Sequence, residues 1–361
     1  MSDQGGVLGL FSGCTGLGGV QASGRLAWDA IRAANGALGS LRLFCYGDTG
    51  PDGPASTDGF HTNSRLKAVL SAMATPRRAG IVVVWHIALL KLLPLFRLRR
   101  AHVVLFLHGV EVWRQLRWPE RTLVRGVDLF LSNSQFTWRR FVEMNPEFAA
   151  CAHRTVLLGI GAPLDGETPP PRTPPVALMV SRLARHENYK GHREMLDAWP
   201  LVQQRVPAAE LWIAGDGDLR AQLEQIAAER GLGAAVRFLG QVSEQDKQCL
   251  IAHSRCMALP SRAEGFGLVY AEAMRLGRPC LVSTLDAARE VVDPPRHGLA
   301  VDPADRESLA AAVGRLLSDS PEWQDWSRLA RKRYEQHFTA HHMQQRFLLA
   351  LAPTHKGMPD E

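Results

Sequence analysis

The sequence predicts an α/β protein made of two doubly wound, Rossmann-like domains that face a central cleft. A chain of 361 residues is longer than one hydrophobic core usually serves, and 46% apolar with 22% charged residues is typical of a globular protein. Short apolar runs alternate with longer amphipathic stretches on both sides of a proline-rich segment. Such alternation builds parallel sheets covered by helices, and ligands of these folds bind beyond the carboxyl ends of the strands.

The first half of the chain contains six apolar runs that are typical of buried strands. They are GVLGLF (6–11), LRLFCY (41–46), GIVVVWHI (80–87), HVVLFLHG (102–109), VDLFLSNS (127–134) and TVLLGIG (155–161). Several of the stretches between these runs have the pattern of helices. We therefore assign residues 1–165 to an N-terminal Rossmann-like domain.

A proline-rich segment separates this domain from the rest of the chain. Five prolines lie within residues 169–175, and because proline suits neither a helix interior nor a central strand, residues 166–175 are predicted to be a linker. The alternation then resumes over residues 176–335, the second Rossmann-like domain, with the runs VALMVS (176–181), ELWIAG (210–215), VRFLG (236–240), CMALP (256–260) and PCLVS (279–283). Residues 320–351 are typical of two successive helices, and we treat residues 336–361 as a separate C-terminal helix.

The positive net charge lies entirely in the first half. Residues 1–167 account for the whole net charge of +6, because they contain 18 Lys and Arg against 12 Asp and Glu. A basic half suits nucleic acid, an anionic membrane surface or an acidic substrate, and it is also compatible with a merely basic surface. The segment KLLPLFRLRR (91–100) combines leucines with cations, so it either lies on a membrane or packs in the core around Pro94.

The six cysteines are scattered without the spacing of a zinc site. The N-terminus lacks the basic start and long apolar core of a signal peptide, and no apolar run is long enough to span a bilayer. We therefore expect a cytoplasmic protein with reduced thiols. Asp216 and Asp218 in GDGDLR (215–220) have the spacing of a metal-binding pair, but aspartates also favour turns and helix caps, so we predict capping and no metal.

The stretch EGFGLVYAEAM (264–274) places one glutamate before a Gly-Phe-Gly turn and another after it. Gly265 and Gly267 disfavour a continuous helix, so we predict a loop carrying Glu264 and a helix that starts near Leu268 and carries Glu272. The N–H groups and the dipole at that helix start favour an anion. Carboxylates on both sides of an anion site suit a ligand with phosphates and hydroxyls.

Further candidate residues follow other predicted strands. In RLARHENYKG (182–191), Arg182 and Lys190 would converge at a strand end and hold a diphosphate, although loop cations are often only solvated charges. The glycine-rich turn GCTGLGGVQ (13–21) lets backbone N–H groups approach a phosphate or a sugar, or is simply a tight turn.

Two histidines also follow predicted strands. His108, in HGVEVW (108–113), could exchange hydrogen bonds with a sugar hydroxyl, and Glu111 could orient it or contact an acceptor. His86 has a similar strand-end position. The competing interpretation is a structural histidine with satisfied hydrogen bonds.

These motifs together resemble family 4 of the retaining glycosyltransferases, which have the GT-B fold and a Glu-x7-Glu motif. EGFGLVYAEAM matches that motif, and SRL…YKGH, WIAGDGDLRAQLE, VRFLGQVSE and ALPSRAEGFG occur in the family's order. The resemblance is close over residues 176–292 and looser before them, where GLGGVQ, HGVEVW and VDLFLSNSQFT match. The sequence departs from the family at TLDAAREVV (284–292), where a Gly-Gly pair is replaced but Glu290 remains, and in a longer gap between Arg182 and Lys190.

The resemblance implies that the C-terminal helix of residues 336–361 crosses back to the N-terminal domain. It also implies roles for individual residues. Glu272 would bind the nucleotide ribose, Glu264 the donor sugar, and Arg182 with Lys190 the diphosphate. The residues implied in catalysis are His108, Arg182, Lys190 and Glu264. Those implied in donor binding are Gly18, Gly19, Val242, Phe266, Gly267, Leu268 and Glu272, and His86 and Glu111 are candidates for acceptor contact.

The resemblance therefore implies a retaining hexosyltransferase that uses a UDP- or GDP-sugar as co-substrate and needs no metal or other cofactor. With its basic N-terminal, acceptor-binding domain, its acceptor would be a saccharide, preferably lipid-linked, in the synthesis of surface polysaccharide or another glycoconjugate. Peripheral contact with an anionic membrane at its inner face is expected, and nucleic acid is not. The alternatives are a sugar phosphorylase or nucleotide-sugar epimerase with the same fold, and a non-enzymatic basic binding protein.

Overall fold

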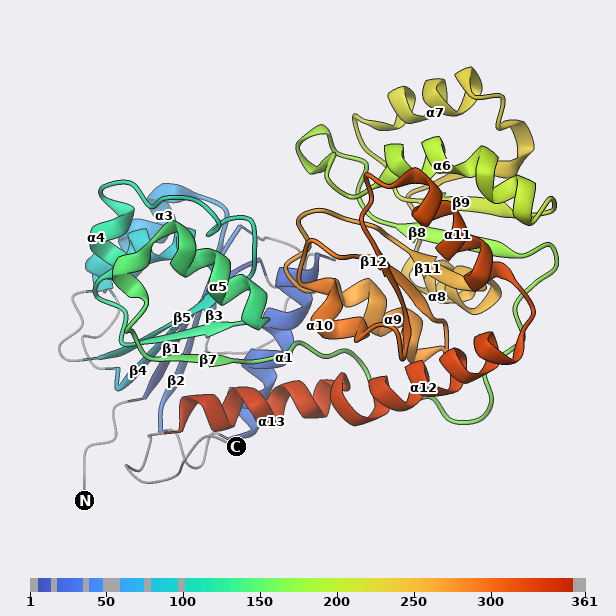
Figure 1. Cartoon of the computed structure of the whole chain (residues 1–361). Helices are drawn as coiled ribbons and strands as arrows, with labels where there is room; N and C mark the ends of the chain where they lie inside the picture. The colour runs from blue at the N-terminus through green and yellow to red at the C-terminus, as the bar shows by residue number, and fades with distance from the viewer. Residues whose placement is uncertain are drawn as a thin grey trace. The chain divides into compact units, whose positions relative to one another are not determined.

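The computed structural model describes residues 6–13, 18–34, 39–47, 59–74, 79–96 and 101–352. The described residues form two parallel sheets covered by helices (Figure 1), which confirms the α/β prediction. The chain divides into two compact units: unit 1 comprises Met1–Gly159 with Ala340–Glu361, and unit 2 comprises Ile160–Thr339.

Unit 1 contains a seven-stranded sheet in the order β3-β2-β1-β4-β5-β6-β7. Its strands are β1 Val7–Ser12, β2 Leu41–Tyr46, β3 Gly59–Thr62, β4 Ile81–Val84, β5 His102–Leu107, β6 Leu129–Ser132 and β7 His153–Thr155. Its helices are α1 Gly19–Ala33, α3 Arg65–Ala74, η1 Ile87–Phe96, α4 Glu120–Val124, α5 Gln135–Met144, η2 Pro146–Phe148 and α13 Ala340–Leu351. The strand order reverses between β1 and β4, so the segments after these two strands flank the usual ligand position of the fold.

In unit 1 the structure corrects one strand prediction and contains one strand that was not predicted. The run 155–161 is not a strand: β7 pairs with β6 through residues 153–155 and ends at Thr155. Val156 and Leu158 are nevertheless buried, which explains the misleading apolar pattern. The short strand β3 was not predicted, because GFHT has only one large apolar residue.

The apolar part of KLLPLFRLRR packs into the protein. Phe96 is 1% exposed and belongs to the core of unit 1, and Leu92, Leu93 and Leu95 are partly buried against that core. Pro94 itself is exposed. This supports the core interpretation for residues 91–96, whereas residues 97–100 lie outside the described part of the chain.

Unit 2 contains a six-stranded sheet in the order β10-β9-β8-β11-β12-β13. Its strands are β8 Val176–Val180, β9 Glu210–Ala214, β10 Val236–Gly240, β11 Cys256–Ala258, β12 Cys280–Ser283 and β13 Gly298–Val301. Its helices are η3 Arg185–Glu187, α6 His192–Arg205, α7 Arg220–Glu229, η4 Gly233–Ala235, α8 Glu244–His253, α9 Leu268–Arg275, α10 Ala288–Val292, α11 Arg306–Leu317 and α12 Pro321–His337. The order reverses between β8 and β11. The loops after these strands carry Lys190 and Glu264, which therefore share the crevice at the switch point.

The two terminal helices belong to different units, and Figure 1 shows them in succession at the red end of the chain. Helix α12 packs against α9 in unit 2, and helix α13 packs against α1 in unit 1. Arg154 of β7 fastens α13 by donating hydrogen bonds to the carbonyl oxygens of Leu349 and Ala350. The prediction of two successive helices in this region is confirmed.

The expectation of reduced thiols holds for four of the described cysteines and is wrong for one. Cys151, Cys249, Cys256 and Cys280 are free. Cys45, the penultimate residue of β2, is disulfide-bonded.

Candidate functional site

The helix that carries the second glutamate begins where the sequence predicted. Gly267 has a left-handed backbone with φ of 80° and caps α9, which starts at Leu268. A β-carbon at Gly267 would lie 2.4 Å from the ring of Tyr270. That ring is fixed, because it is buried and its hydroxyl donates a 2.7 Å hydrogen bond to the carbonyl of Leu259. A glycine is therefore required for the turn to approach the helix this closely.

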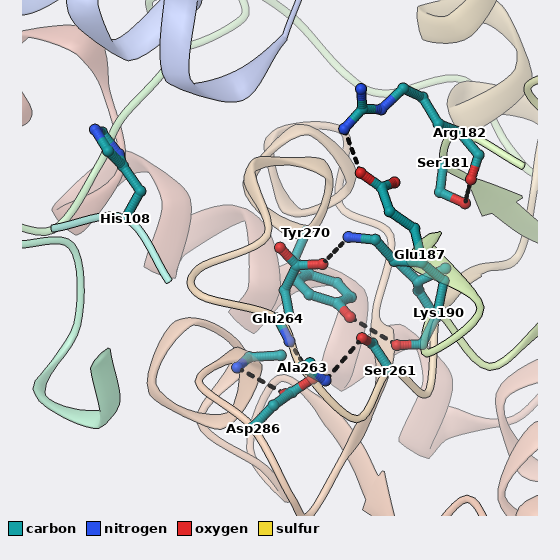
Figure 2. Close-up of polar contacts among 12 residues, drawn as sticks. His108, Ser181, Arg182, Glu187, Lys190, Ser261, Ala263, Glu264, Tyr270 and Asp286 are labelled. Atoms are coloured by element: carbon teal, nitrogen blue, oxygen red, sulfur yellow. Dashed lines mark hydrogen bonds and ion pairs between the residues drawn. The ribbon is translucent and has the colours of Figure 1, made fainter. Parts of the chain in front are cut away.

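Glu264 and Lys190 form a close ion pair in the crevice of unit 2 (Figure 2). Lys190 Nζ lies 2.6 Å from Glu264 Oε2, and the two side chains are 14% and 16% exposed. Burial is the largest single influence and opposes the charge of Lys190. The charge and the hydrogen bond of Glu264, with smaller contributions from neighbouring groups, together outweigh it and raise the pKa of the ammonium group. The pair therefore presents a fixed cation and a fixed carboxylate side by side.

The loops that carry this pair are locked together by their backbones. Gly191 has a φ of 84°, and a β-carbon there would lie 2.5 Å from the carbonyl oxygen of Pro260. The N–H of Arg262 donates to the carbonyl of Tyr189 over 2.8 Å. The loop after β8 and the loop after β11 thus hold Lys190 and Glu264 at a defined separation.

Arg182 points to a different partner. Its guanidinium pairs with Glu187, whose side chain is 10% exposed, while that of Arg182 is 75% exposed (Figure 2). The two cations predicted to converge on a diphosphate therefore each have a carboxylate of their own. An exposed guanidinium remains able to turn toward a ligand, since a surface ion pair contributes only about 0–1 kcal/mol.

Glu272 is held by a lysine that sequence reasoning missed. Lys247 Nζ, on α8, lies 2.9 Å from Glu272 Oε1 and 2.9 Å from Glu244 Oε2. Burial raises the pKa of Glu272, and Lys247 acts against that rise. No motif marks Lys247; only the packing of α8 against α9 brings the two side chains together.

Asp286 is a second residue that the sequence motifs missed. Its Oδ2 accepts a 3.0 Å hydrogen bond from the N–H of Glu264, and its Oδ1 accepts one of 3.1 Å from the N–H of Ala288 (Figure 2). Burial, together with the nearby charge of Glu264, raises the pKa of Asp286 to about 7. The departure from the family pattern at TLDAAREVV was the one available signal, since Asp286 lies within it.

Two of the remaining donor-binding candidates in unit 2 have defined surroundings. Phe266 is 2% exposed and its ring contacts that of Phe338 edge-on, so only its backbone is suited to a ligand. Val242 lines an open pocket of about 350 Å³ between α8 and the sheet edge, together with Trp212 and Leu250.

In unit 1, the predicted residues occupy the ends of β1, β4 and β5. Gly18 caps α1 with an extended backbone and Gly19 is its first residue. Residues 14–17 of the glycine-rich turn lie outside the described residues. The N–H of the Trp85 indole donates to the carbonyl of Val20 over 2.9 Å, which ties the first turn of α1 to the segment after β4.

His108 is a buried, neutral imidazole. Its Nε2 lies 2.5 Å from the carbonyl oxygen of Trp85, and because a carbonyl only accepts, Nε2 carries the proton. Burial lowers the pKa of His108 to about 4, although Glu111 acts in the opposite direction. Nδ1 is then a hydrogen-bond acceptor at neutral pH.

Glu111 and His86 lie next to His108. Glu111 Oε1 accepts hydrogen bonds of 2.7 and 3.1 Å from the N–H groups of His108 and Gly109, so it orients the histidine through the backbone. The ring of His86 stacks near that of His108, with centroids 6.3 Å apart.

The aspartates of GDGDLR do not cap a helix, which corrects the sequence prediction. Helix α7 starts at Arg220 without a side-chain cap. Asp218 instead accepts a 2.8 Å hydrogen bond from the N–H of Arg185, and Asp216 pairs with Arg220. Both carboxylates therefore stabilise loops. In the described ranges, no group of three or more His, Cys, Asp or Glu side chains is placed to hold a metal ion.

Residues 174–319 match the family described as Glycosyl transferases group 1. A glycogen synthase of Mycobacterium tuberculosis is 33% identical over 168 residues, which are 46% of this chain and 40% of that protein. A phosphatidyl-myo-inositol mannosyltransferase of the same organism is 37% identical over 159 residues, 43% of this chain and 40% of that protein. The chain thus matches about two fifths of the length of these curated relatives.

Solved structures resemble the chain over almost its whole length. Anabaena HepE in complex with UDP-glucose has a TM-score of 0.72 at 20% identity, covering 96% of this chain and 99% of that one. A sucrose-phosphate synthase of Thermosynechococcus elongatus has a TM-score of 0.72 at 18% identity, covering 95% and 98%. The fold is that of the GT-B glycosyltransferases, as the sequence resemblance implied.

Proposed function

We propose that this protein is a retaining glycosyltransferase that moves a hexose from a UDP- or GDP-sugar to a saccharide acceptor. The observation that carries the proposal is the pair of anchored glutamates at the start of α9. Glu264 is held by Lys190 and Glu272 by Lys247, on either side of the left-handed turn at Gly267. This arrangement suits a ligand that has hydroxyls at both ends and phosphates between them.

Different residues of unit 2 bind different parts of the donor. Glu272 accepts from the ribose hydroxyls and Glu264 from hydroxyls of the transferred sugar. The N–H groups of Gly267 and Leu268 meet phosphate oxygens, favoured by the positive end of the α9 dipole. Lys190 and Arg182 supply cations for the diphosphate.

The reaction breaks the bond between the sugar C1 and the diphosphate oxygen and forms a bond from C1 to the acceptor oxygen on the same face. The acceptor hydroxyl gives its proton to the departing phosphate, so no protein nucleophile is required. Lys190, Arg182 and the helix dipole stabilise the charge that develops on the leaving group. These groups take the part that a metal plays in other transferases, and we propose that the reaction needs none.

The residues of unit 1 are proposed to serve the acceptor side. The neutral imidazole of His108 suits hydrogen bonding with a sugar hydroxyl, and His86 and Glu111 are its neighbours. One of the two M. tuberculosis relatives is named a phosphatidyl-myo-inositol mannosyltransferase. We extend the proposal to a lipid-linked saccharide acceptor, in surface polysaccharide or glycoconjugate synthesis, with the enzyme at the cytoplasmic face of a membrane. No helix in the described part of the chain is long and apolar enough to cross a bilayer.

The test is product analysis with a set of UDP- and GDP-sugars and saccharide acceptors. The expected result is release of nucleoside diphosphate only when a matching acceptor is present, with NMR showing that the transferred sugar keeps its anomeric configuration. Inversion of the anomeric centre would contradict the mechanism. Sugar 1-phosphate formed from a glycan and inorganic phosphate would instead identify a phosphorylase.

A further inference from the structure

Helix α3 of unit 1 buries small side chains and exposes large ones. Leu66, Leu70 and Met73 are 69%, 58% and 51% exposed, whereas Ala68 and Ala72 are fully buried. Positions i, i+4 and i+7 lie on one face of a helix, so the three large apolar side chains form a continuous stripe. We call Leu66, Leu70 and Met73 the α3 stripe.

This orientation is the reverse of an ordinary surface helix. Burial of large apolar side chains is the main favourable term in folding, so a helix normally turns its leucines inward and its alanines outward. Here the alanine face is the buried one, while the neighbouring η1, which packs against α3, fills the core with its own leucines and Phe96. The α3 stripe is therefore exposed and able to contact another apolar surface.

The charge of this segment selects the kind of partner. In the described part of residues 59–110, the Lys, Arg, Asp and Glu side chains are Arg65, Lys67 and Lys91, all of them cations. Two of these cations, Arg65 and Lys67, are exposed on α3 itself. Leucines combined with cations on one exposed helix are typical of helices that lie in the interface of an anionic bilayer.

We propose that the α3 stripe, with Arg65 and Lys67, is the surface by which this protein docks on an anionic lipid bilayer. A second copy of the chain would bring the same cations against each other, and single-stranded nucleic acid would need aromatic side chains for stacking, which α3 lacks. The proposal also moves the membrane contact away from KLLPLFRLRR, whose Phe96 is buried in the core. It specifies the membrane part of the proposed function but does not depend on transferase activity.

The experiment is co-sedimentation of the full-length chain with vesicles of phosphatidylcholine alone or mixed with phosphatidylglycerol. The stripe variant carries Leu66→Ser, Leu70→Ser and Met73→Ser. The matched control is Leu349→Ser, which removes an exposed leucine from α13 of the same unit, where it is 72% exposed. A second variant, Arg65→Gln with Lys67→Gln, tests the charge. All replaced side chains are exposed, so the melting temperature should hardly change.

The proposal predicts binding to the anionic vesicles that weakens with salt. The stripe variant should lose at least about tenfold in vesicle affinity, and the charge variant about five- to thirtyfold, at roughly a factor of five per cation. Leu349→Ser should bind like the original chain. Equal binding by the stripe variant, or no vesicle binding at all, would overturn the proposal. The proposal would also be overturned if the α3 stripe instead holds two copies of the chain together. In that case the stripe variant would have half the mass of the original chain in solution. Donor binding by unit 2 is measured without lipid, so either result leaves the transferase proposal to its own test.

Discussion

Replacing Gly267 with alanine tests whether the turn before α9 positions the two glutamates. Two separate costs follow from the structure. The left-handed backbone at φ of 80° costs an alanine about 1–2 kcal/mol. In addition, the new β-carbon would lie 2.4 Å from the Tyr270 ring and 3.1 Å from Glu264 Cγ, and overpacking of this kind costs about 1–3 kcal/mol.

Gly231→Ala provides a matched control in the same unit. Gly231 has a φ of 65°, but a β-carbon there has no atom within 4 Å. The control should therefore lose only the backbone part, about 1–2 kcal/mol, whereas Gly267→Ala should lose about 2–5 kcal/mol in total. The difference between the two variants isolates the clash with Tyr270 and Glu264.

The assay is thermal unfolding of both variants, followed by titration with UDP- and GDP-sugars at a temperature where each is folded. Gly267→Ala should melt clearly below Gly231→Ala, by the equivalent of about 1–3 kcal/mol. It should also bind the donor more weakly, because the clash displaces Glu264. The reasoning is refuted if the two alanine variants have the same melting temperature and the same donor affinity.

Three further predictions follow from the buried charges and the proposed chemistry. Lys247→Met should weaken donor binding at neutral pH, because Glu272 loses the cation that opposes its raised pKa, and part of the binding should return as the pH rises. The measurement is donor affinity as a function of pH, and a profile equal to that of the original chain would exclude this role of Lys247. Asp286 has a folded pKa of about 7 against about 3.8 when unfolded, so the folded chain holds a proton that the unfolded chain has released between these values. The original chain should therefore lose up to about 1.4 kcal/mol of stability per pH unit relative to Asp286→Asn from about pH 4 to 7, and none above, as measured by denaturant unfolding. Chelation of divalent metal with EDTA should leave product formation unchanged, and a loss restored by Mg²⁺ would contradict the metal-free mechanism.

Sequence patterns predicted the fold well where strands are apolar and glycines are structurally required. The break at Gly267 was visible because glycine in two nearby positions argues against a helix, and the structure has the helix begin at Leu268. The predicted strand at 155–161 was wrong because burial and strand pairing produce the same apolar pattern, and of this run only Thr155 belongs to strand β7.

The candidate site was predictable only in part. The motifs marked Lys190 and Glu264, but no pattern predicted their direct contact, because it depends on the packing of two loops far apart in the chain. Lys247 carries no motif, and its role appears only when α8 lies beside α9. The aspartates of GDGDLR were misassigned as caps, because side chains that favour caps also bind neighbouring loops, as Asp218 does with the N–H of Arg185.

The most direct test of the central claim is calorimetric titration of UDP- and GDP-sugars into the original chain, Glu272→Gln and Glu224→Gln. Glu224 pairs with Arg220 on α7 and is 44% exposed, so its replacement removes an equal charge from the same unit without touching α9. We expect one donor to bind the original chain and Glu224→Gln equally and to bind Glu272→Gln at least tenfold more weakly. Equal binding by Glu272→Gln, or no binding of any donor, would contradict a nucleotide-sugar site at the start of α9.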